Sequence, residues 1–341
     1  MMKNAHRKEV KTTAMTEPDP VDGLRTGMRA VVRRRIEHGV TDALGDIEAI
    51  DADTISVRTR LGLVVIPRDV VTAAKEVPPR STRRGAPHLA ISMDDLERIM
   101  VEGWPPVERA ELGDWILRAG AGSTGRANSV LPLGNPGLPL SVAVDHCESW
   151  YDERGLRRQF ALFGPAGFAV DDDPLGQELL RRGYEPFNNT LVLTAATATL
   201  PPEAPHRTLA PVRFESTMSP SWWEARNAWK GSPGVATADA RAVMTGSPEQ
   251  LFASLEMGGA HVGIARVAFS HAWAGVFSLH VAPEHRRSGV AGQLMAAIAD
   301  AARARGIRSM YLQVFQANSP ARSLYERLDF STHHEYRYLG G

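Results

Sequence analysis

Short runs of alternating apolar and polar residues fill the first part of the chain, from Leu24 to about Val77. Apolar side chains at every second position are typical of strands that bury one face. Turns rich in glycine or aspartate separate the runs, which lie at Met28–Ile36, Leu44–Ile50, Thr54–Thr59 and Leu63–Ile66. Four or five strands spaced so closely predict a small, curled, all-β barrel over residues 24–80.

From Leu89 onward the pattern changes to helices that alternate with strands. The expected helices lie at Ser92–Val101, Val142–Arg154 and Pro174–Arg182, and the expected strands at Asp114–Arg118, Ala127–Leu133, Gln159–Phe163 and Thr190–Thr194. After the proline-rich segment Pro201–Pro211 we expect a strand near Val212, a helix that begins at Ser219, and a hairpin of His261–Phe269 with Trp273–Val281. Such alternation predicts an α/β fold.

The order helix, strand, helix, strand occurs a second time near the end of the sequence. Arg154-Gly155-Leu156 corresponds to Arg305-Gly306-Ile307, and Leu179 takes the position of Tyr325. A repeated supersecondary order indicates two related units. We therefore expect a degenerate first unit at 89–200 and a second unit at 208–341. Residues 1–23 show no hydrophobic pattern and are expected to be disordered.

Composition narrows the class of protein. Lys and Arg total 39 and Asp and Glu total 39, so the net charge of zero argues against a bulk polyanion as an obligatory partner. The single cysteine, Cys147, cannot form an internal disulfide, and a cytoplasmic location fits. No apolar run is long enough to span a membrane, and no apolar core of a signal peptide precedes Met15.

Arg33-Arg34-Arg35 raises the question of nucleic-acid binding by the first part of the chain. That part has balanced charges and no aromatic residue for base stacking, so a nucleic-acid partner is not expected. The alternative is that these arginines face solvent, and that the barrel docks on the rest of the chain or mediates self-association, as in a homodimer.

The stretch from Val276 to Arg305 predicts a strand, a turn and a long helix. Gly289 and Gly292 lie where the helix should begin, beside Arg286 and Arg287. Unpaired N–H groups and the helix dipole favour an anion there, and glycine allows its close approach. A pyrophosphate suits such a site, although an ordinary capped helix is the alternative. The turn itself carries neither the G-x-G-x-x-G fingerprint nor the P-loop pattern.

This turn resembles the R/Q-x-x-G-x-G/A motif of the GCN5-related N-acetyltransferases (GNAT), with Arg286, Gly289 and Ala291 at its positions. A later segment is similar to the family's N-x-x-A-x-x-L/F-Y-x-x-x-G-F pattern, and its matching residues are Asn318, Ala321, Leu324, Tyr325 and Phe330. Asp329 stands where the family has glycine, but aspartate also tolerates the left-handed conformation that a helix end needs.

The resemblance implies a mixed-sheet GNAT fold, acetyl-coenzyme A as cosubstrate and no metal. Acetyl-coenzyme A would lie between splayed strands, with backbone groups of Leu279, His280 and Val281 at the pantetheine and thioester, and Asn318 on the pantetheine arm. The residues implied at the pyrophosphate are Arg286, Arg287, Ser288, Gly289, Val290, Ala291 and Gly292.

The family's mechanism is direct attack by an amine on the thioester, with the oxyanion held near Val281 and the thiolate protonated by Tyr325. A core position for this tyrosine is the alternative. Many relatives use a strand carboxylate as general base, but Ala272–Leu279 contains none. The remaining candidates for that base are His280, His271 and Glu256 acting through water.

The acceptor side is less specified by the sequence. Trp222, Trp223 and Trp229 would shape an apolar or cationic-amine acceptor pocket, although packing in the core is the stronger expectation for at least one of them. Gly122–Ser129 would supply a polar substrate loop or only a hairpin turn. The first unit lacks both the arginine-glycine loop and the tyrosine, so we expect it to close one side of the substrate cleft.

As a whole, the chain resembles a bacterial group in which an SH3-like barrel precedes a tandem GNAT body. The leading interpretation is an acetyl-coenzyme A dependent N-acetyltransferase that acts on a primary amine. One alternative acetylates a specialised small thiol precursor or an aminosugar, and another is a non-catalytic sensor that binds acyl-coenzyme A. Small amines, peptide N-termini and protein lysines all stay open as acceptors.

Overall fold

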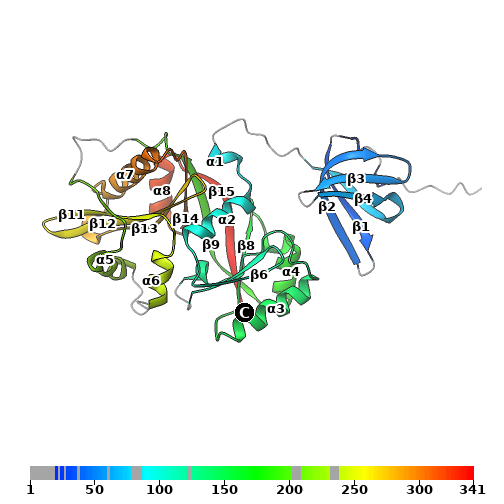
Figure 1. Ribbon diagram of the computed structural model, residues 1–341, viewed down its shortest axis with the longest axis horizontal. Coiled ribbons are helices and arrows are strands. Elements are labelled where there is room, and N and C mark those ends of the chain that lie inside the picture. Colours follow the sequence, from blue (N-terminus) through cyan, green and yellow to red (C-terminus); the bar gives the residue numbers. More distant parts are fainter. Residues whose placement is uncertain are drawn as a thin grey trace, which may run out of the picture. The chain divides into compact units, whose positions relative to one another are not determined.

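The computed structural model describes residues 20–21, 24–26, 28–36, 39–59, 62–77, 87–120, 124–201, 209–230 and 238–341. The chain divides into two compact units, residues 1–82 and 83–341 (Figure 1). Each is considered by itself. The segment Pro78–Pro87, which its prolines and arginines predict to be a linker, lies outside the described residues except for Pro87, and so does nearly all of the N-terminal segment expected to be disordered.

The first unit is a five-stranded antiparallel sheet in the order β4-β3-β2-β1-β5. Its strands are β1 (Arg29–Ile36), β2 (Gly39–Ile50), β3 (Thr54–Thr59), β4 (Gly62–Pro67) and β5 (Val71–Glu76). Alternation places Ile47, Ile55 and Ile66 in a shared core. The predicted strands are confirmed, and β5 adds one; closure into an SH3-like barrel stays a prediction. Arg33 faces solvent and pairs with Asp42 across 2.9 Å.

The second unit is built on one mixed sheet of eight strands, in the order β10-β11-β12-β13-β14-β9-β15-β8. β13 and β14 are parallel, whereas the other neighbours are antiparallel. The strands are β8 (Gln159–Gly164), β9 (Glu185–Ala196), β10 (Arg213–Glu215), β11 (Gln250–Met257), β12 (Ala260–Ser270), β13 (Trp273–Val281), β14 (Ser309–Phe315) and β15 (Ser331–Gly340). A separate hairpin joins β6 (Glu108–Leu112) to β7 (Trp115–Ala119).

Helices cover both faces of this sheet. They are α1 (Pro87–Ala90), α2 (Met93–Gly103), α3 (Leu140–Asp152), α4 (Pro174–Arg181), α5 (Pro220–Lys230), α6 (Ala238–Thr245), α7 (Val290–Ala304) and α8 (Ser319–Arg327). Figure 1 shows α7 and α8 on one side of β11–β13 and α5 and α6 on the other. The mixed α/β fold is thus confirmed.

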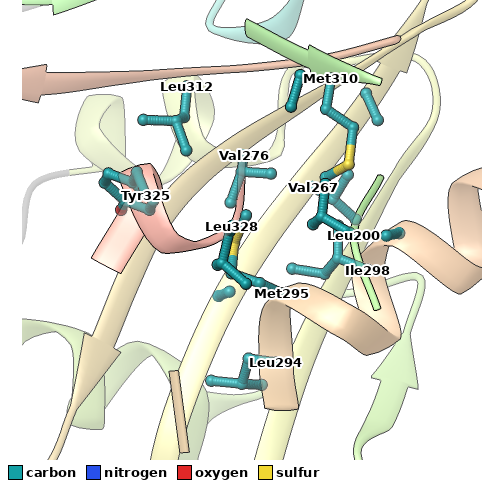
Figure 2. Packing of buried hydrophobic residues seen from close by; sticks show 14 of the residues in the cluster. Leu200, Val267, Val276, Leu294, Met295, Ile298, Met310, Leu312, Tyr325 and Leu328 are labelled. Carbon is teal, nitrogen blue, oxygen red and sulfur yellow. The ribbon is translucent and has the colours of Figure 1, made fainter. Parts of the chain in front are cut away.

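A separate apolar core lies on each side of the strands. Side chains of α7 such as Leu294 and Ile298 pack with Val267 and Met310 of the sheet (Figure 2). On the opposite face Trp222 is fully buried, and its indole N–H donates to the Ala253 carbonyl across 3.0 Å. The two cores fix β13 and β14 from both sides.

The repeated order appears in the structure as α3-β8-α4-β9 and α7-β14-α8-β15. The ends of the helices match in detail. The N–H of Tyr184 donates to the Leu179 carbonyl across 3.0 Å, and that of Phe330 donates to the Tyr325 carbonyl across 3.0 Å. Asp329 has a φ of 63°, so the aspartate takes the left-handed conformation as expected.

The predicted strand Ala127–Leu133 is wrong. Gly125–Ala127 forms a short 3₁₀ turn, and only isolated bridges follow, at Val130 and Leu131. The Asn128 side chain accepts from the Gly120 N–H across 2.7 Å and donates to the Thr124 carbonyl across 2.6 Å. Within the predicted strand, the Asn128 carbonyl accepts from the Gln159 side chain and the Ser129 carbonyl accepts from the Arg118 side chain, so neither group can join a strand ladder.

Candidate functional site

The strands β13 and β14 separate partway along their length. Their pairing runs from Trp273 with Ser309 to Val276 with Leu312 and ends there. Two residues later Ser278 has a φ of 50°, and the register of β13 against β12 shifts between Ile264 and Arg266. A bulge of this kind bends its strand, so the end of β13 diverges from β14.

A cavity of about 820 Å³ opens at this divergence. One wall comes from β13, β14 and α8, through Val276, Phe277, Ser278, Leu279, His280, Gln313, Val314, Phe315, Asn318, Ala321 and Tyr325. The opposite wall comes largely from residues before 200 and from β15, among them Trp104, Thr124, Gly125, Arg126, Asn128, Phe187, Tyr336 and Tyr338. Both halves of the second unit therefore enclose one space.

The structure brings together some of the residues expected at the site. Leu279, His280, Asn318 and Tyr325 line the cavity, whereas Val281 is not among its lining residues. The loop 286–292 is not part of this lining either; it follows β13 at the surface.

The loop after β13 leaves the start of α7 open. Gly289 caps the helix with a φ of 95°, and Gln293 N–H donates to the Gly289 carbonyl across 3.0 Å. In the described part of the chain, the N–H groups of Val290, Ala291 and Gly292 have no backbone acceptor. A methyl group added at Gly289 or Gly292 would meet nothing within 4 Å. These features, with exposed Arg286 and Arg287, fit a bound pyrophosphate.

Close packing holds that helix start against the sheet. Gly263 of β12 lies opposite Val281, and a Cβ at Gly263 would come within 2.3 Å of Val290. Only glycine at this position lets α7 approach so closely. The loop 286–292 is thus fixed relative to the bulged end of β13.

Tyr325 projects from α8 and combines burial with contact to the cavity. It is 8% exposed, and its ring meets that of Phe330 edge-on at 5.8 Å. No described residue hydrogen-bonds to its hydroxyl. Burial raises the pKa of Tyr325 to about 12, so the phenol keeps its proton at neutral pH. The ring belongs to the core of α7 and α8, so the expected alternative, a core position, is confirmed.

Asn318 begins α8 and caps it. Its side-chain oxygen accepts from the Ala321 N–H across 3.3 Å, while the residue also lines the cavity. Capping through the oxygen leaves the amide N–H₂ group as a donor for a bound molecule.

The candidates for the general base separate in space. His280 lines the cavity. His271 lies at the β12–β13 turn, at the far end of β13, where its Nε2 is 2.8 Å from Glu102. Glu256 lies on β11 beside His261, at 3.4 Å. Of the three candidates, His280 is therefore the one that lines the cavity, whereas His271 and Glu256 are not among its lining residues.

The three tryptophans do not line the cavity. Trp222 and Trp223 belong to the core, and Trp229 packs against it, as the stronger expectation stated. From their helix it is Arg226 that reaches the cavity. Of the predicted polar loop, residues Thr124, Gly125, Arg126 and Asn128 line the cavity, whereas 122–123 lie outside the described residues.

Two kinds of feature are absent from the described residues. No helix there is long and apolar enough to cross a membrane. Likewise, no group of three or more His, Cys, Asp or Glu residues among them is arranged to hold a metal ion.

Known proteins resemble this chain over most of its length. A relative from Mycobacterium tuberculosis called "Probable histone acetyltransferase Rv0428c" is 28% identical over 325 residues, which cover 92% of this chain and 94% of the relative. The Bacillus subtilis "Uncharacterized N-acetyltransferase YobR" is 26% identical over 250 residues, covering 72% and 98%.

Solved structures show the same fold at low identity. A GCN5-related N-acetyltransferase from Kribbella flavida superposes with a TM-score of 0.52 at 16% identity, covering 73% of this chain and 96% of the other. A tandem GNAT protein from the clavulanic acid biosynthesis pathway gives 0.51 at 15%, covering 77% and 91%.

A family model supplies the assignment. Residues 92–339 match the model described as "Probable histone acetyltransferase Rv0428c C-terminal", which spans most of the chain. The relatives and the fold agree with it. The chain therefore belongs to this family and is an N-acetyltransferase of the GNAT type.

Proposed function

We propose that this enzyme transfers the acetyl group of acetyl-coenzyme A to a primary amine by direct attack, in the cavity between β13 and β14. The observation that carries the proposal is the divergence of these strands after Val276, with Tyr325 lining the gap. GNAT enzymes use acetyl-coenzyme A, and the open start of α7 has the donors that its pyrophosphate needs.

The proposed reaction follows from the residues around the gap. The neutral amine nitrogen forms a bond to the thioester carbon, and backbone groups of Leu279, His280 and Val281 stabilise the oxyanion. As the C–S bond breaks, the thiolate takes the proton of the Tyr325 hydroxyl. His280, directly or through water, accepts the proton that the amine loses. The products are the N-acetyl amine and coenzyme A.

Residues 89–200 are proposed to form an inactive GNAT-like unit that shares its sheet with the catalytic unit, 208–341. The matched helix ends described above support a repeat. Leu179 stands where the catalytic half has Tyr325, so the first half lacks the proposed acid. Its contribution is the far wall of the cavity. The SH3-like barrel of 24–80 is proposed as a docking module.

The remaining hypotheses differ in which acceptor the enzyme uses, or in whether it transfers an acetyl group at all. The name of the M. tuberculosis relative points to a protein lysine as a second candidate acceptor. A coenzyme-binding sensor without catalysis would have no use for a tyrosine in the cavity, so Tyr325 argues against it.

Calorimetric titration with acetyl-coenzyme A, coenzyme A and NAD tests the proposal first. We expect selective binding of the two coenzyme A species. Release of free thiol in the presence of an amine panel should follow. Binding without release would favour the sensor, and absence of binding would refute the assignment of the loop 286–292.

A further inference from the structure

The cavity wall opposite β13 carries positive charge without compensation. Three arginines, Arg126, Arg157 and Arg226, line the cavity, and no aspartate or glutamate is among its lining residues. Arg126 lies between aromatic rings, with its guanidinium carbon 5.5 Å from the centre of Trp104 and 5.6 Å from that of Phe277. Its Nε is buried without a hydrogen-bond partner, and it forms no ion pair with any described residue.

The surroundings of Arg126 add to this excess. Arg266 is fully buried and approaches the same two rings, at 5.5 and 5.1 Å. Its hydrogen bonds go to neutral groups, namely the side chains of Gln250 and Ser247 and the Gly103 carbonyl. Burial lowers the pKa of Arg266 to about 9, which reflects how poorly its charge is compensated.

One carboxylate borders Arg126 on its other side, across a much smaller neighbouring cavity. That group is Glu97, and its Oε1 is 3.0 Å from Nε2 of the buried His334. Glu97 is thus already engaged and makes no ion pair with Arg126 among the described residues. Burying a cation without a counter-ion is costly, so a bound anion would stabilise this wall.

The phosphates of coenzyme A do not account for Arg126. Phe277, which Arg126 contacts, lies on β13 before the bulge, whereas the anion-binding loop begins beyond Val281. The four residues from Phe277 to Val281 span roughly 13 Å of extended strand. Arg126 therefore lies away from the pyrophosphate loop, on the side from which an acceptor would enter.

We propose that the acceptor is a small primary amine that also carries an anionic group, a carboxylate or a phosphate, and that Arg126 binds this group. This inference rests on the proposed function. A guanidinium binds either anion through two parallel hydrogen bonds, and the aromatic faces of Trp104 and Phe277 hold it in place. The same positive charge opposes a lysine-rich peptide.

Matched amines test the proposal in the full-length enzyme at saturating acetyl-coenzyme A. Thiol release is measured for glycine and glycinamide, for 4-aminobutyrate and its amide, for phosphoethanolamine and ethanolamine, and for a lysine-rich histone-tail peptide. We expect at least one anionic amine to exceed its neutral partner in kcat/KM by about tenfold or more, which is the scale of one charge-assisted contact. The carboxylate and phosphate pairs identify which anion is bound.

Variants then assign the preference to one residue. Arg126→Gln should raise KM for the anionic amine and remove the preference, while Arg126→Lys keeps part of it and the Kd of acetyl-coenzyme A stays unchanged. Arg109→Gln, an exposed arginine on β6 that pairs with Glu111, should change nothing. The wild-type comparison needs no variant, so a misfolded Arg126→Gln does not prevent the test.

Equal use of charged and neutral amines, a higher kcat/KM for the peptide, or no release with any anionic amine despite coenzyme binding would overturn the acceptor assignment. Absence of acetyl-coenzyme A binding would instead overturn the proposed function, and the acceptor assignment with it.

Discussion

Replacing Tyr325 by phenylalanine separates its two roles, as a core residue and as the proposed acid. Phenylalanine keeps the ring in its place against Phe330, and no described residue hydrogen-bonds to the hydroxyl that is lost. The free energy of unfolding should therefore change by less than about 1 kcal/mol. Turnover should fall by about 10²- to 10⁴-fold, the usual contribution of a general acid, which corresponds to roughly 2.7–5.4 kcal/mol in the activation barrier.

The assay compares kcat from thiol release, the Kd of acetyl-coenzyme A and urea unfolding in wild type and Tyr325→Phe. Because the pKa of Tyr325 is raised to about 12, the phenol stays protonated throughout the usual assay range. Any alkaline loss of rate below pH 10 should then persist in the variant. Wild-type turnover in Tyr325→Phe would refute the acid role.

Tyr151 offers a matched control on α3 of the first half. Its hydroxyl donates to the Arg118 carbonyl across 2.9 Å and accepts from the Arg118 N–H across 3.3 Å. Tyr151→Phe should lower the free energy of unfolding by about 1–2 kcal/mol and leave kcat unchanged. The two variants should thus show opposite patterns of stability and activity.

Three further predictions concern other parts of the chain. Gly289→Val should raise the Kd of acetyl-coenzyme A about tenfold or more, because the added side chain covers the helix start. The left-handed φ of 95° should also lower the free energy of unfolding by roughly 1–3 kcal/mol, so the Kd is measured by calorimetry on protein shown to be folded, and an unchanged Kd would contradict the prediction. Burial lowers the pKa of His88 and of His333, so the unfolded chain binds more protons below about pH 6.5, and the free energy of unfolding should fall as the pH drops from 7.5 to 5.5. A His333→Gln variant should flatten that dependence in urea titrations, and an equally steep dependence would show that other groups cause it. The fragment 83–341 has its own cores and should bind acetyl-coenzyme A with the Kd of the full-length protein, and calorimetry on the two proteins would measure both values.

The sequence predicted those parts of the site whose conformation depends on residues close together in the chain. The strand Trp273–Val281, the glycine cap at Gly289 and the left-handed Asp329 depend on local backbone preferences, and all three are present. Both motifs belong to this local class. A family resemblance could therefore be recognised from short stretches alone.

Features that depend on contacts between distant residues could not be predicted from the sequence, and the reason is physical. The strand β11 (Gln250–Met257) is buried along its middle on both faces, so it lacks the alternation by which strands are recognised. The place of Arg126 in the cavity depends on contacts with Trp104 and Phe277, which are distant in sequence, so the sequence alone did not identify it as a candidate site residue. The one signal for it was its place in a polar, glycine-rich loop.

The position of β9 between β14 and β15 constrains how the protein reaches its fold. β9 pairs with strands that lie more than 100 residues later, at Ser309–Phe315 and Ser331–Gly340. During synthesis, the edges of β9 therefore stay unpaired until β14 and β15 have been made, and unpaired strand edges favour aggregation. Pairings of this high contact order form slowly. We expect the folding of this enzyme to depend on the late arrival of β15, which joins β9 to β8, and hence on protection of the nascent first half until then.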